Sequence, residues 1–83
     1  MSVIQKGLFA VMELFPNHTD TVKRLFRENE TFQAMCEDYM RCAEALRYWN
    51  QVESEEAPAR REEYGVLLRD MEAEIFQSLN ESK

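Results

Sequence analysis

Glycine and proline are scarce in this chain of 83 residues, which contains only two of each. Phosphate-binding loops, dinucleotide-binding turns and nucleophile elbows each need at least two closely spaced glycines. The glycines at positions 7 and 65 lie far apart, so the sequence contains none of these motifs. A chain with few helix breakers, 45 % hydrophobic residues and 31 % charged residues is typical of a folded helical domain.

Basic residues and long apolar runs are also in short supply. Ten Lys and Arg stand against 16 Asp and Glu, a formal net charge of -6, so counterion release gives no reason to expect a nucleic-acid partner. The apolar stretch 7–15 is interrupted by Glu13, is too short to span a bilayer and is followed by no signal-peptide cleavage pattern. Anchoring of residues 1–15 at a membrane surface is disfavoured, because Lys6 is their only basic residue.

The chain has two cysteines and one histidine. Cys36 and Cys42 are six positions apart, which in a helix separates their Cα atoms by about 9 Å and excludes a disulfide between them. Free thiols suit a reducing compartment, so we expect a cytoplasmic protein in which both cysteines are small core residues. Neither C-x-x-C nor H-x-x-x-H spacing occurs, so we expect no metal and no cofactor. The alternative is a ligand or metal sensor in which His18 and Cys36 converge with carboxylates when the N-terminal helix folds back.

Two stripes of large apolar residues dominate the sequence and predict a helical hairpin. Spacings of three and four residues are typical of a helix that packs lengthwise on another helix. The first stripe comprises Phe32, Met35, Tyr39, Cys42, Leu46 and Trp49, and the second comprises Tyr64, Leu68, Met71, Ile75 and Leu79. An acidic stretch at 53–57 separates them, so we expect antiparallel arms at 30–52 and 57–80, with Leu46 and Trp49 buried between them. Inside the second arm Gly65 has no role that the sequence shows, beyond close approach of a neighbouring helix.

Residues 1–28 predict one or two short amphipathic helices packed on the hairpin. The first carries Ile4, Leu8, Val11, Met12 and Phe15 on one side. It should end at Pro16, and Asn17 is placed to cap a second helix over 18–28. Asn29 offers another cap and predicts a break there; because apolar residues repeat every seven positions through this point, one continuous helix is the alternative. The fold expected for residues 1–83 is therefore a single all-α domain, a small helical bundle.

Two segments resemble a known family. The first segment, 25–32, contains Leu25, Asn29 and Phe32, and Tyr39 lies seven residues after Phe32. The second segment, 69–75, is acidic and aliphatic. In this respect the chain resembles the YdcH-like family of short bacterial proteins of unknown function, over roughly residues 15–79. The resemblance implies a helical hairpin in a bacterial, cytoplasmic protein, with no catalytic residues to carry over.

Several apolar residues fit neither stripe. A possible partner surface comprises Phe9, Met40, Tyr48 and Phe76. The residues that fit neither stripe, Met40, Tyr48, Val66 and Phe76, meet either the N-terminal helices folded back on the hairpin, or an unknown protein partner or a second copy. A catalytic site needs titratable groups gathered in a cleft, which so short a helical chain rarely leaves, so we expect no enzyme. The sequence predicts a non-catalytic interaction or structural protein.

Overall fold

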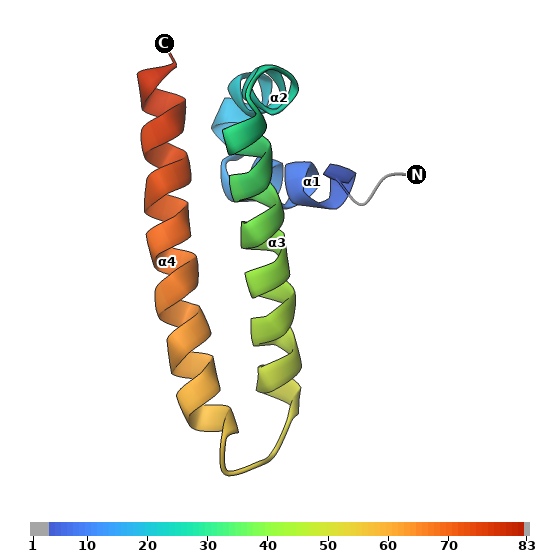
Figure 1. Cartoon of the computed structure of the whole chain (residues 1–83), viewed down its shortest axis with the longest axis vertical. Helices are drawn as coiled ribbons and strands as arrows, with labels where there is room; N and C mark the ends of the chain where they lie inside the picture. The colour runs from blue at the N-terminus through green and yellow to red at the C-terminus, as the bar shows by residue number, and fades with distance from the viewer. Residues whose placement is uncertain (1–3, 83) are drawn as a thin grey trace.

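The computed structural model describes the backbone of residues 4–82, which are helical apart from short connections and contain no strand. The elements in chain order are α1 (Ile4–Leu14), a 3₁₀ turn η1 (Pro16–His18), α2 (Thr19–Glu28), α3 (Glu30–Gln51) and α4 (Ala57–Glu81). The predicted all-α fold is confirmed. The molecule is elongated, 44 × 28 × 21 Å, because α3 and α4 run along most of its length (Figure 1).

The two long helices α3 and α4 form the predicted antiparallel hairpin and lie side by side (Figure 1). Pro58 lies in the first turn of α4, where its missing N–H is not needed. One turn further on, Arg61 Nη1 donates a 3.0 Å hydrogen bond to the carbonyl oxygen of Trp49 at the end of α3. Half-way along the hairpin, the Tyr39 hydroxyl donates a 3.2 Å hydrogen bond to Glu72 Oε2 of α4. These two bonds fix the register of the arms.

Asn29 breaks the chain between α2 and α3. Its backbone is extended, with φ -134° and ψ 110°, and its Oδ1 atom accepts a 3.1 Å hydrogen bond from the Phe32 amide. The predicted break is therefore confirmed, and the alternative of one continuous helix is wrong. The expected cap at Asn17 is wrong as well, because Asn17 lies inside η1 and His18 precedes α2 without capping it through its side chain.

The core lies where α1 and α2 meet the upper half of the hairpin, since α1 crosses α3 and α2 closes its end (Figure 1). Its buried members come from all four α-helices: Val11, Val22, Leu25, Phe26, Phe32, Cys36, Ile75 and Leu79. On α3 the buried row is Phe32, Cys36 and Met40. The buried side of α3 is therefore rotated relative to the predicted stripe, because α3 packs against α1 on one side and against α4 on the other. Leu46 and Trp49 of that stripe are only half-buried.

The two glycines occupy opposite environments. A Cβ atom at Gly7 would lie 3.0 Å from backbone atoms of Cys36 and Glu37, so glycine is what lets α1 cross α3 this closely. A Cβ atom at Gly65 would meet nothing within 4 Å. The close approach considered for Gly65 is therefore wrong for that position and is found at Gly7.

Alanine substitutions at these two glycines should change stability in opposite directions. Gly65→Ala should raise the free energy of unfolding by about 1 kcal/mol, because alanine is the better helix former and the space is open. Gly7→Ala should lower it by about 1 kcal/mol or more, because overpacking against a helix backbone costs about 1–3 kcal/mol and outweighs the same propensity gain. Urea denaturation of the two variants checks both signs; a gain at both positions would show that α1 does not cross α3 as described.

Candidate functional site

The predicted partner surface is divided among different environments. Met40 is only 8 % exposed, so it belongs to the core and not to the surface. Helix α1 covers it, which agrees with the alternative that the N-terminal helices fold back over these residues. Phe9 and Tyr48 are exposed on α1 and α3. The four predicted residues therefore do not form one patch that a partner could contact as a whole.

Phe76 is partly exposed, but its ring already has neighbours. It stacks on Phe15 with the ring centroids 5.8 Å apart and meets the ring of His18 edge-on at 6.3 Å. Phe15 and His18 also meet edge-on, at 6.4 Å. His18 is consequently half-buried in an aromatic cluster that ties η1 to α4.

The two thiols are protonated and shielded. Burial, with the charge of Glu37 adding to it, raises the pKa of Cys36 from 9.0 to about 12. Burial and the charge of Asp38 raise the pKa of Cys42 as well. Since the thiolate is the nucleophile and the metal ligand, neither cysteine is prepared for either role. Within residues 4–82, no group of three or more His, Cys, Asp and Glu side chains is gathered as a metal site would need, and His18 and Cys36 are no exception.

The Tyr39 hydroxyl should make stability fall at high pH. Burial, the charge of Glu72 and the hydrogen bond to Glu72 raise the pKa of Tyr39 from 10.0 to about 12. The unfolded chain loses this proton at lower pH than the folded chain, so the contribution is complete below about pH 10 and declines toward pH 12. Tyr39→Phe should cost about 1 kcal/mol at pH 7 through the lost hydrogen bond, yet show a shallower decline from pH 10 to 12. Urea denaturation across this range measures both; parallel curves for the two proteins would contradict the assignment.

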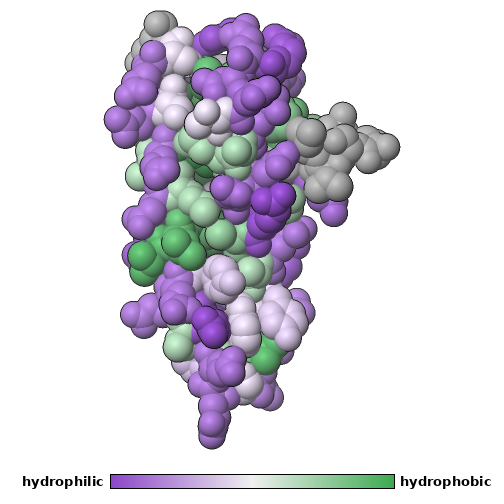
Figure 2. Space-filling model, in the orientation of Figure 1, coloured by the Kyte–Doolittle hydropathy of each residue, from purple (hydrophilic) through white to green (hydrophobic). Residues whose placement is uncertain are grey.

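A groove runs between α3 and α4 on the face opposite α1. Two hollows, of about 230 and 80 Å³, meet at Met35. Along α3 and α4 they are lined by Thr31, Met35 and Asp38 and by Met71, Glu74, Ser78 and Glu81, and the larger is closed at its end by Leu25, Asn29, Phe32 and Ser82. The lining residues recur every three or four positions, at 31, 35 and 38 on α3 and at 71, 74 and 78 on α4. The same helical spacing places Cys42 next in the row on α3 and Leu67 first in the row on α4. We call residues 31, 35, 38, 42, 67, 71, 74, 78 and 81 the groove face. Figure 2 shows it from the front as an apolar band between hydrophilic borders.

The charges on the groove face are acidic. Asp38, Glu74 and Glu81 line the two hollows, and no lysine or arginine lines either of them. The nearby Arg41 is paired with Asp38 at 3.2 Å and with Glu37 at 3.7 Å. Glu74 and Glu81 take part in no salt bridge among the described residues. The apolar band is therefore bordered by negative charge that is only partly neutralised.

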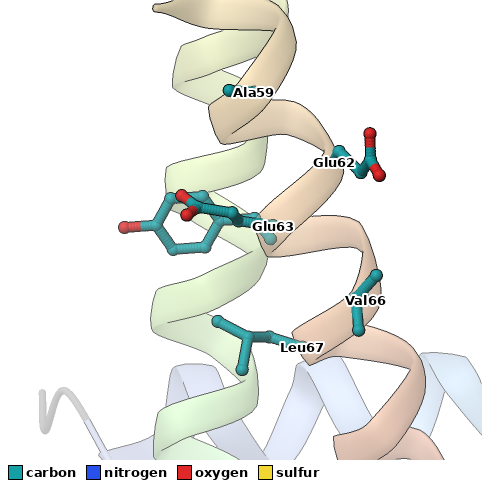
Figure 3. Close-up of a pocket in the computed structure, with 6 residues that line it drawn as sticks. Ala59, Glu62, Glu63, Val66 and Leu67 are labelled. Atoms are coloured by element: carbon teal, nitrogen blue, oxygen red, sulfur yellow. The ribbon is translucent and has the colours of Figure 1, made fainter.

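Two other hollows are less suited to binding. One, of about 760 Å³, is lined by residues 59–67 of α4 alone, so it is relief on a single helix. Figure 3 shows Leu67 pointing from α4 to the side where α3 lies, and Val66 pointing away. The other lies between α1 and α3, where Lys6 and Arg47 balance Glu13 and Glu44 around Met40. Among these hollows of the described residues, only the pair on the groove face lies between two helices and carries one sign of charge.

Comparison with known proteins adds no relative: no family model, no curated protein and no solved structure matches the chain. The resemblance to the YdcH-like family thus stays a prediction. In the part of the chain that the structure describes, no helix has the length and apolar character needed to cross a membrane.

Sequence reasoning missed the groove face because it assigned Met35 and Met71 to a closed seam. Both are half-buried, since α3 and α4 have no third helix over this side. Leu67 was not singled out, although it is 44 % exposed and lies one turn before Met71. The sequence feature that could have indicated the groove face is the pair Leu67 and Met71, which are four residues apart and next to the seam position Leu68.

Proposed function

We propose that this protein is non-catalytic and acts by binding another protein through the groove face. One observation carries the proposal: the hairpin leaves an apolar band uncovered along one side of α3 and α4, while α1 and α2 cover the other side and the end. Apolar surface that is contiguous and bordered by polar groups is typical of interaction sites.

The thiols and the tyrosine support binding over catalysis. The groups with displaced pKa values, Cys36, Tyr39 and Cys42, are all shifted upward, which keeps them protonated near neutral pH. Catalytic nucleophiles and bases have pKa values matched to their task, which for a cysteine nucleophile means a lowered pKa. These three side chains are therefore suited to packing between helices and not to nucleophilic or acid–base catalysis.

Site-specific photo-crosslinking tests this function. A photoreactive phenylalanine analogue is placed at position 67, which faces the groove, or at position 66, the matched control that is equally exposed but points about 100° away on the same helix. In cells that produce the protein, we expect one defined protein adduct from position 67 and none from position 66. No adduct at 67, or the same adducts from both positions, would refute the proposal.

A further inference from the structure

We infer that the partner element is an amphipathic helix whose polar flanks are basic, supplied by a different protein. This inference rests on the proposed function and names the chemistry of the ligand at the groove face. The shape of the groove face and the sign of its charge both fit such a helix, and a second copy of this chain does not.

The groove face has the dimensions of a helix-binding groove. Its α3 row covers residues 31 to 42, of which 31, 35 and 38 line the two hollows and Cys42 follows at the same helical spacing. At about 1.5 Å per residue the row is roughly 16 Å long, or three helical turns. The apolar members of the groove face, Met35, Cys42, Leu67 and Met71, are spaced along the two antiparallel helices. A third helix with anchors at i, i+3, i+4 and i+7 would lie between these rows. Two of the four are methionines, whose flexible side chains adapt to such anchors.

The acidic charge on the groove face determines which side chains can border the apolar side of that helix. Asp38, Glu74 and Glu81 border the apolar band. Arg41 is already paired with Asp38, and Arg24, which is hydrogen-bonded to Ser82 beside Glu81, is paired with Glu28 at 3.5 Å. Arg69 lies five residues before Glu74, but helical spacing places it on the opposite side of α4. A basic side chain on the incoming helix would meet Glu74 and Glu81, which no salt bridge of the described residues occupies. Acidic flanks would place like charges together and would be rejected.

A second copy of this chain does not supply such a helix. The basic segment of the chain is α2, with Lys23, Arg24 and Arg27, but its apolar residues Val22, Leu25 and Phe26 are buried in the core of the same molecule. Two groove faces brought together would oppose their acidic borders, in a protein whose net charge is already -6. The charge therefore favours a basic partner over self-association.

Binding of synthetic peptides to the full chain tests the inference. The probe is a fluorescent peptide of leucine and lysine, about 18 residues long, with leucines at helical spacing so that one face is apolar. Two controls keep its length: one replaces every lysine by glutamate, and one scrambles the order so that the apolar face is lost. In fluorescence anisotropy we expect the lysine peptide to bind at least about tenfold more tightly than either control.

Paired variants locate the site. Leu67→Lys should weaken binding of the lysine peptide at least about tenfold, whereas Val66→Lys, equally exposed at 44 % in the wild-type chain, should not. The double variant Glu74→Gln, Glu81→Gln should weaken binding about threefold or more and reduce its salt dependence. Glu13→Gln with Glu62→Gln removes the same charge from outside the groove face and should leave both properties unchanged.

Several outcomes would overturn the inference. Equal affinity for the lysine and glutamate peptides would remove the role of charge, and equal effects of the two double variants would reduce it to general attraction by an acidic protein. A wild-type dimer in light scattering that Leu67→Lys dissociates would make a second copy the occupant. If crosslinking at position 67 captures a partner while the lysine peptide fails to bind, the proposed function stands and only this inference falls.

Discussion

Replacing Phe32 by alanine should lower the free energy of unfolding by about 3–5 kcal/mol, which is a large part of the stability of so small a domain. Phe32 is 2 % exposed and belongs to the core cluster to which α1, α2, α3 and α4 all contribute. Removing its ring leaves a cavity that none of the four helices can fill without losing its own contacts. Urea denaturation followed by circular dichroism measures the loss.

Leu46→Ala serves as the comparison, because the sequence placed Leu46 in the same seam. Leu46 is half-buried and is not part of the core cluster, so its truncation should cost only about 1–2 kcal/mol. If Leu46→Ala proves more costly than Phe32→Ala, the core lies between the two long arms and the arrangement of α1 and α2 over their upper half is wrong.

Helix boundaries were predictable because they depend on local chemistry. Pro16 ends α1, Asn29 caps α3 through its own side chain, and Pro58 opens α4, each by an interaction between close neighbours in sequence. The arms expected at 30–52 and 57–80 agree with Glu30–Gln51 and Ala57–Glu81 to within one residue at each end. No partner helix is needed to decide such features.

The rotation of the core was not predictable from the pattern of one helix. Helix α3 is apolar over more than half of its circumference, so the stripe through Tyr39 and Leu46 and the row through Cys36 and Met40 were both available for burial. The position of α1 decides between them, and it depends on Gly7, whose missing side chain admits the backbone of Cys36. A single glycine has no periodicity, which is why this crossing could not be foreseen.

The groove face was hidden for a related reason. A spacing of three and four residues predicts that one helix packs on another, but it does not show how many helices share the contact. On this side of α3 the structure supplies only α4 as a partner, and it leaves Met35 and Met71 at the edge of the interface. Met35 and Met71 lie at a surface because no third helix of the described residues covers this side of α3 and α4. The sequence pattern of the two helices does not show whether a third helix covers them.

Deleting residues 1–15 should expose a second apolar face and lower the free energy of unfolding by more than about 3 kcal/mol. The deletion removes α1, whose Val11 is fully buried and whose Leu8 and Met12 pack against the core. It uncovers Cys36 and Met40 on the side of α3 opposite the groove face. We expect stronger binding of an apolar dye and a higher apparent mass in light scattering.

A synthetic peptide of residues 1–15 provides the control, because it should reverse dye binding when added to the truncated chain. The substitution Glu13→Gln, on the exposed side of α1, should by contrast leave stability and dye binding unchanged in the full chain. A truncated chain that remains monomeric, binds no dye and unfolds at the same urea concentration would show that α1 does not cover the core. The buried state of Met40 and the close contact at Gly7 would then both be wrong, since each depends on α1 lying across α3.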